Sequence, residues 1–186
     1  LLNEFTILEN QRLKKVVDDY LVKSDVIIAK VLSDKGSPFL RSIIINKGSK
    51  HKINLGMAVM DGAYLVGKVV EVNYLSSRVL LLSDLNSKIP VIIEPGGIQS
   101  ILSGTGKKNG IIQYQKNTDP IKSQSIIYTS GSGGIFKAGI PIGMSKKIDS
   151  SINQMILDNL QNEVIFFSDL SQLKFVKILS FNKQTK

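Results

Sequence analysis

A serine, a histidine and an aspartate that could form a hydrolytic triad occur in this chain in a permitted order. Ser132 lies among glycines in the run Gly131–Gly134, where a nucleophilic hydroxyl would be exposed, and His51 and Asp84 precede it. Two features argue against a triad. His51 is flanked by lysines and should lie in solvent, and a glycine rather than the usual aspartate stands directly before Ser132. We expect the glycines to permit positive φ in a tight loop, and we keep a periplasmic chymotrypsin-like serine protease as an alternative.

A second glycine-rich run, Gly104–Lys108, superficially resembles a phosphate-binding loop. That loop needs wider spacing between its glycines and a helix directly after it, whereas here a β-rich run begins at Ile111. We therefore expect a hairpin turn. The chain has no cysteine and one histidine, which excludes disulfides, thiolate catalysis, cysteine zinc sites and histidine-rich metal sites. No two carboxylates are spaced for catalysis, and Asp169 is expected to cap a turn, so we expect neither cofactor nor metal.

The formal net charge of +9 would suit an anionic partner such as nucleic acid, a membrane surface or a cell-wall polymer. Nearly all the basic residues, however, are scattered lysines, whereas specific nucleic-acid readers favour arginine and clustered aromatic residues. We expect a lysine-rich soluble surface and no nucleic-acid binding, with a generic anion-binding β module as a further alternative. No apolar run approaches about 18 residues, so no transmembrane helix is predicted. Because the first residue is Leu1 rather than methionine, we expect an upstream signal peptide or membrane anchor to be absent from this sequence.

Residues 1–21 form the one long stretch with a helical pattern. They contain neither glycine nor proline, and their large apolar residues follow a four-then-three spacing in two offset stripes. Such a pattern predicts either a coiled coil with a stutter or a lone amphipathic helix packed on its own domain. The residues expected to mediate self-association are Leu1, Phe5, Leu8, Leu13, Val17 and Tyr20.

The rest of the chain consists of short β-rich runs separated by glycine, asparagine and aspartate. This pattern predicts a mainly β structure of the antiparallel barrel or sandwich type. Residues 150–161 fit a helical stripe, and we leave this segment open between helix and strand. The expected strands are Val26–Leu32, Ile43–Ile45, Met57–Val59, Leu65–Val72, Val79–Leu82, Val91–Ile93, Ile98–Leu102, Gly110–Gln115, Ile126–Thr129, Pro141–Gly143, Val164–Phe167 and Phe175–Phe181.

Six sequence blocks carry a family resemblance: IINKGSKHKINLGMAV, LVGKVVEV, SSRVLLLSDLNSKIPV, ILSGTG, TSGSGGIFKAGIPIG and FFSDLSQLKFVKIL. In this order and spacing they resemble MreC, the family of bacterial rod shape-determining proteins. The resemblance implies an N-terminal coiled-coil helix followed by two small β-barrel-like domains, the second inserted in the first. Carried over by motif, the coiled-coil helix covers 1–23, the first β-domain 24–83 plus 146–181, the second 84–145, and a tail 182–186. His51 and Ser132 would then lie in different domains, and 150–161 would be strand.

The same resemblance implies a non-enzymatic scaffold that maintains cell shape by organising the cell-wall elongation complex. Its implied partners are a second copy of itself, in a dimer or higher assembly, the elongation-specific penicillin-binding transpeptidase, the membrane protein MreD and the MreB cytoskeleton. The implied location is periplasmic, with an inner-membrane anchor upstream of this sequence. Ile135 and Phe136 follow the Gly131–Gly134 run directly, and with Lys137 they are the candidate partner surface. The alternative for the two apolar residues is to plug the second barrel, because exposing both is costly.

Overall fold

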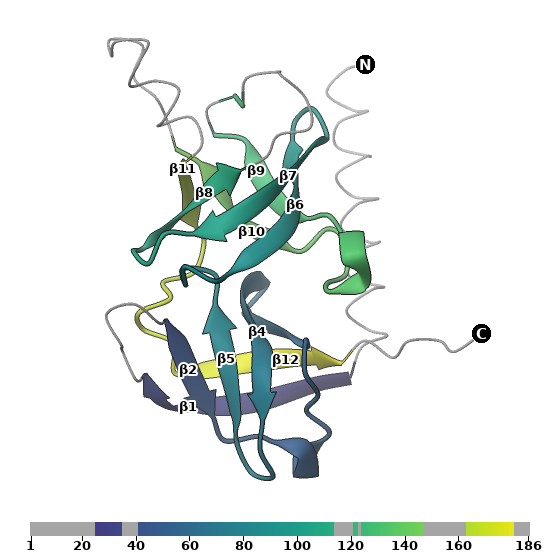
Figure 1. Ribbon diagram of the computed structural model, residues 1–186, viewed down its shortest axis with the longest axis vertical. Coiled ribbons are helices and arrows are strands. Elements are labelled where there is room, and N and C mark those ends of the chain that lie inside the picture. The colour runs from purple at the N-terminus through teal and green to yellow at the C-terminus, as the bar shows by residue number, and fades with distance from the viewer. Residues whose placement is uncertain (1–24, 35–40, 114–120, 123, 147–162, 181–186) are drawn as a thin grey trace, which may run out of the picture.

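The computed structural model describes residues 25–34, 41–113, 121–122, 124–146 and 163–180 (Figure 1). In this part the chain is almost entirely β-structure, arranged as two closed antiparallel barrels. All of the expected strands overlap observed ones, so the prediction of a mainly β fold with two barrel-like domains is confirmed. The predicted coiled-coil helix, the segment 150–161 and the tail 182–186 lie outside the described residues.

The first barrel closes through six strands whose inward side chains form its core. On β2, for example, Ile43 and Ile45 are buried while Ser42 and Ile44 are half-exposed, as alternation on a strand with one face in a core requires. In spatial order the strands are β1 (Asp25–Asp34), β12 (Phe175–Ser180), β3 (Ala58–Asp61), β4 (Tyr64–Val72), β5 (Ser77–Leu81) and β2 (Ser42–Ile45).

The second barrel is an insertion in the first, because all of its strands lie between β5 and β12 along the chain. Every second residue of its strands again points into the core. On β6, Ile89, Val91 and Ile93 are all buried. In spatial order the strands are β10 (Pro141–Ser145), β11 (Glu163–Phe166), β8 (Asn109–Gln113), β7 (Ile98–Gly104), β6 (Lys88–Glu94) and β9 (Ile126–Thr129).

One predicted domain boundary is wrong. Residues 146–181 were expected to return to the first barrel as a block, but β11 pairs with β10 through Gly143 and Phe166 and with β8 through Ile111 and Glu163. This strand therefore completes the second barrel, and only the chain after it returns to the first. Both β11 and β12 are short alternating strands, so their sequences do not reveal which neighbours they pair with.

The two barrels lie one above the other, joined by two linkers (Figure 1). The outgoing linker follows β5 and the return linker follows β11. Backbone hydrogen bonds tie both linkers to strands: Leu82 N–H donates to Val66 O (3.0 Å), and Phe167 N–H donates to Ile142 O (3.1 Å). The rings of Tyr64 on β4 and Phe167 on the return linker are 5.0 Å apart between centroids. The junction is thus a packed contact between the barrels.

Candidate functional site

The structure does not assemble the candidate triad. His51 ends the short helix η1 (Ser49–His51) in the first barrel, whereas Ser132 begins η2 (Ser132–Gly134) between β9 and β10 of the second. His51 Nδ1 accepts a hydrogen bond from its own turn, from Gly48 N–H at 3.3 Å. Asp84 is fully buried at the barrel junction. The serine protease alternative is therefore wrong, because its nucleophile, base and acid belong to three separate local structures.

Asp84 instead holds the outgoing linker in place. Its Oδ2 accepts from the backbone N–H of Arg41, directly before β2 of the first barrel, and its Oδ1 accepts from the backbone N–H of Asn86, both at 2.7 Å. A buried carboxylate needs such donors, and these bonds connect the first barrel to the chain that enters the second. The sequence offered no signal for this role, because the donors are backbone groups.

The run that superficially resembled a phosphate loop is the β7–β8 hairpin, as expected, and it closes on the same linker. Gly106 N–H donates to Ser83 O (2.8 Å), and Gly104 N–H donates to Ser87 O (3.1 Å). A Cβ on Gly104 would lie 2.1 Å from Asp84 O, so only glycine allows this approach. We call the hairpin turn 104–106 and the linker 82–87 the junction clasp.

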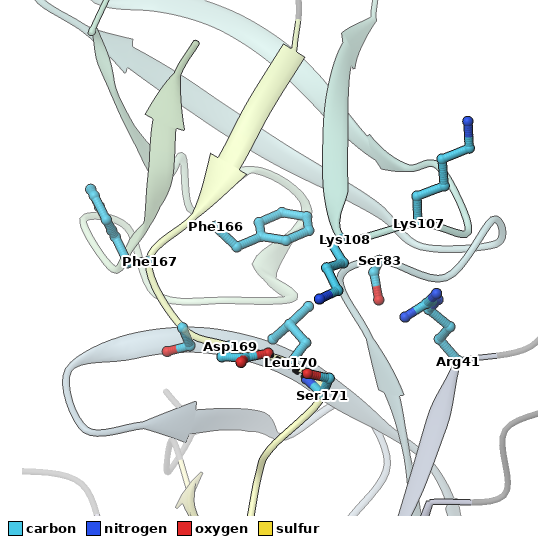
Figure 2. A pocket seen from close by; sticks show the side chains of 10 residues that line it. Arg41, Ser83, Lys107, Lys108, Phe166, Phe167, Asp169, Leu170 and Ser171 are labelled. Atoms are coloured by element: carbon cyan, nitrogen blue, oxygen red, sulfur yellow. Dashed lines mark hydrogen bonds between the residues drawn. The ribbon is translucent and has the colours of Figure 1, made fainter. Parts of the chain in front are cut away.

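A cavity of about 280 Å³ lies beside the junction clasp (Figure 2). Its wall combines basic groups, buried hydroxyls and two aromatic rings from both barrels and both linkers. The described lining residues are Arg41, Ser83, Lys107, Lys108 and the segment 166–171, which runs from the end of β11 into the return linker. Sequence analysis missed this cavity, because residues far apart in the chain meet only at the junction of the two closed barrels.

Asp169 sits at the rim of this cavity and caps a turn, as expected. Its Oδ1 accepts from the Ser171 hydroxyl (2.6 Å) and from the Ser171 backbone N–H (3.0 Å). These two hydrogen bonds, with a smaller contribution from the Lys108 ammonium, hold the pKa of the Asp169 carboxyl below its usual range. The rim therefore keeps one negative charge at neutral pH.

The Gly131–Gly134 loop has the positive φ angles that were expected, +75° at both Gly131 and Gly133. The two apolar residues that follow this loop differ in how deeply they are buried. Phe136 is buried in the core, whereas Ile135 is 38% exposed. The backbone O of Lys137 accepts from Thr129 Oγ1 at 2.5 Å, which fixes the loop to β9. The burial of Phe136 is what a barrel plug requires, and a partner contact by Ile135 and Lys137 stays a prediction.

A second apolar surface, on β1 and β12, was not singled out from the sequence. Its exposed side chains, Val26, Ile28, Leu32 and Phe175, belong to neighbouring strands of the first barrel. Lys30 pairs with Phe175 and Lys177 pairs with Ile28 across the two strands, so cations alternate with the apolar groups. Both faces of β1 carry apolar residues in the sequence, so which face points outward is decided only by barrel closure.

An ion pair links two strands of the second barrel's wall to the chain that follows β10. Lys146 Nζ lies 2.8 Å from Glu163 Oε2, and Asn109 Nδ2 donates to Glu163 Oε1 at 2.5 Å. The Lys146 hydrogen bond is the largest cause that lowers the pKa of Glu163, with burial opposing it and Asn109 adding to it. The arrangement is structural, since each polar group is engaged with the barrel itself.

Among the residues that the structure describes, no three histidine, cysteine, aspartate or glutamate side chains converge as metal ligands. The described segments also include no helix of the length and hydrophobicity that a membrane crossing needs.

Comparison with known families identifies the chain. The family model described as the rod shape-determining protein MreC, barrel core, matches residues 31–180, which span both barrels. The chain belongs to the MreC family. It is 36% identical over 153 residues to the cell shape-determining protein MreC of Caulobacter vibrioides, covering 82% of this chain and 42% of that protein. It is 38% identical over 113 residues to MreC of Cereibacter sphaeroides, covering 61% of this chain and 38% of that protein. The chain thus spans about two fifths of these MreC proteins.

Solved MreC structures have the same fold. The crystal structure of MreC from Pseudomonas aeruginosa has a TM-score of 0.71 and 29% identity, with 84% of this chain and 99% of that chain covered. The MreC structure solved in complex with penicillin-binding protein PBP2 from Helicobacter pylori has a TM-score of 0.60 at 16% identity, covering 86% of this chain and all of that one. MreC proteins are structural, cell shape-determining proteins and not enzymes, which agrees with the dispersed triad.

Proposed function

We propose that this chain is the barrel core of a membrane-anchored, extracytoplasmic scaffold that maintains cell shape by organising cell-wall elongation. The family match over residues 31–180 carries the proposal, because it covers both barrels and their junction. The proposed direct partner is the elongation-specific penicillin-binding transpeptidase, and the Helicobacter pylori complex of PBP2 with MreC supports that choice. Connection to MreB and MreD, and anchoring to the inner membrane upstream of Leu1, complete the proposal.

The architecture suits a scaffold for two physical reasons. Both barrels are closed, so neither offers a free strand edge for uncontrolled pairing with another chain. The junction clasp and the Tyr64–Phe167 contact then fix how the barrels are held together. Partners must therefore bind through side-chain surfaces, whose relative positions the junction maintains.

We assign the transpeptidase contact to the loop that bears Ile135, with Lys137 on its rim. An exposed apolar side chain beside polar groups is what the centre of a protein interface requires. The test is binding of the full chain to the transpeptidase's extracytoplasmic region by biolayer interferometry. Ile135→Ser should weaken binding by about tenfold, whereas Ile165→Ser, which removes a similarly exposed isoleucine from β11, should not. Equal affinities for both variants and the native chain would place the contact elsewhere, and no binding at all would contradict the scaffold proposal.

Self-association is assigned to the stripe on residues 1–21, which lies outside the described residues. Sedimentation velocity compares the full chain with a chain that begins at residue 22. A concentration-dependent dimer formed only by the longer chain is expected. Monomers of both at high concentration would contradict the assignment and indicate that the stripe packs on its own molecule.

A further inference from the structure

The cavity beside the junction clasp is lined by more basic than acidic side chains among the residues that the structure describes. Arg41, Lys107 and Lys108 line it, and Asp169 is the one carboxylate among the lining residues that lie in the described part of the chain. Figure 2 shows the Lys108 ammonium and the Arg41 guanidinium on either side of the Ser83 oxygen, while the Lys107 side chain points away. The cavity wall therefore presents two cations flanking one hydroxyl.

Arg41 is held in a fixed orientation. Its backbone N–H donates to Asp84 Oδ2 (2.7 Å), its backbone O accepts from Leu81 N–H (3.1 Å), and its Nε donates to Gly106 O (2.8 Å). Among the residues that the structure describes, no acceptor pairs with its two terminal amino groups. With Nε engaged, those two groups form a prepositioned fork, the arrangement that binds a carboxylate or phosphate with two parallel hydrogen bonds.

Two buried hydroxyls in the same wall have no hydrogen-bond partner in the part of the chain that the structure describes. Ser83 is 1% exposed and Ser168 is 8% exposed, and neither Oγ makes a hydrogen bond within the described structure. Buried polar groups are almost always paired, so each unpaired one requires an explanation. Figure 2 shows the Ser83 oxygen directed between Lys108 and Arg41. Hydroxyl hydrogens rotate to suit an acceptor, and an anion held by the two cations would supply one.

We propose that this junction cavity binds an oxyanion, the carboxylate or phosphate group of a small ligand. Arg41 and Lys108 hold the charge, and Ser83 and Ser168 donate hydrogen bonds to it. The cavity's volume of about 280 Å³ is at the small end for ligand sites, so it suits one acidic head group, with Phe166 and Leu170 against its carbon atoms. Because the wall comes from both barrels and both linkers, an occupied site ties them together. This proposal rests on the cavity alone and does not depend on the proposed partners.

Titration of the ¹⁵N-labelled full chain tests the proposal. The probes are inorganic phosphate and N-acetylglycine, each added at constant ionic strength set with sodium chloride, and the readout is the amide shifts. Saturable shifts are expected at Arg41, Ser83, Lys108 and Ser168. Arg41→Gln should weaken binding about tenfold or more, because a charge-assisted fork is lost. The matched control is Arg78→Gln, which removes an exposed arginine paired with Glu71 and should leave the affinity unchanged.

Two further variants keep the test decisive if Arg41→Gln fails to fold. Lys108→Gln should weaken binding, whereas Lys88→Gln, at an exposed lysine on β6, should not. Ser83→Ala should weaken binding several-fold without lowering the melting temperature, because its hydroxyl has no protein partner to lose. Stronger binding of phosphate or of N-acetylglycine identifies which oxyanion the site prefers. No saturable shift, or shifts of equal affinity in every variant, would show an adventitious ion only and would overturn the proposal.

Discussion

Replacing Gly104 by alanine should test whether the junction clasp determines stability. The added Cβ would lie 2.1 Å from Asp84 O and 2.6 Å from Leu82 O, both backbone atoms that no side-chain rotation can move. The linker would have to retreat by about 1 Å to restore van der Waals contact. It is held there by the Gly106–Ser83 backbone hydrogen bond, among others. Overpacking costs about 1–3 kcal/mol and a strained or lost hydrogen bond about 1 kcal/mol, so we expect a loss of about 3 kcal/mol.

The assay is guanidinium chloride unfolding followed by circular dichroism, supported by thermal melts. A loss of that size should lower the melting temperature by roughly 6–12 °C for a chain of this length. Gly97→Ala is the matched control: its φ is +62°, but no atom lies within 4 Å of the added Cβ, so backbone strain of about 1–2 kcal/mol is the whole cost. If Gly104→Ala costs no more than Gly97→Ala, the clasp does not constrain the junction and the reasoning fails.

Four other substitutions probe three separate parts of the structure. Asp84→Asn replaces one carboxylate oxygen by an NH₂ group, which cannot accept from one of the two backbone N–H donors. It should lower the free energy of unfolding in urea by about 1.5–3 kcal/mol, and unchanged stability would contradict the role of Asp84 in the linker. The pKa of Glu163 is lowered from the usual 4.5 by the Lys146 hydrogen bond, so its stabilisation is present above pH 4.5 and is lost as pH falls through the lowered folded-state value. Glu163→Gln should therefore reduce the decrease in the free energy of unfolding at acid pH. The same decrease in the variant and the native chain would refute this. Phe136→Ala should lower the free energy of unfolding by about 3–5 kcal/mol, whereas Ile135→Ser should change it by no more than about 0.5 kcal/mol. Similar changes for both would show that the two side chains are not placed as described.

The strands were predictable because successive residues of a half-buried strand alternate between the core and the outer face, and residue types follow this alternation. Ile43 and Ile45 alternate with half-exposed residues on β2, and the turns between strands carry glycine, asparagine and aspartate. Strand pairing was less predictable. The sequence of β11 fits either barrel, and only its hydrogen bonds to β8 and β10 assign it to the second.

The candidate sites were harder to predict than the strands, since their roles depend on contacts distant in sequence. Ile135 and Phe136 are adjacent and chemically alike, yet one is exposed and the other buried. The local sequence allowed a barrel plug or a partner surface for the pair, but it could not show which of the two residues is buried. Asp84 looked like a possible catalytic acid because of its position in the chain. Its actual hydrogen-bond donors are backbone N–H groups, which every residue type except proline carries, so the sequence does not reveal them.

The glycine-rich runs that first suggested chemistry show how a non-enzymatic fold acquires motifs that look catalytic. Gly104 is required because another backbone passes 2.1 Å from where its Cβ would lie, and Gly131 because its φ is +75°. Both requirements come from the backbone, so neither needs a reactive side chain nearby. A catalytic loop is recognised instead by polar groups that converge on it without being engaged elsewhere. Both carboxylate oxygens of Asp84 are engaged, whereas the terminal amino groups of Arg41 and the hydroxyl of Ser83 have no partner among the described residues. The uncommitted polar groups of this chain therefore point to the junction cavity as the place to look for a ligand, and away from both glycine loops.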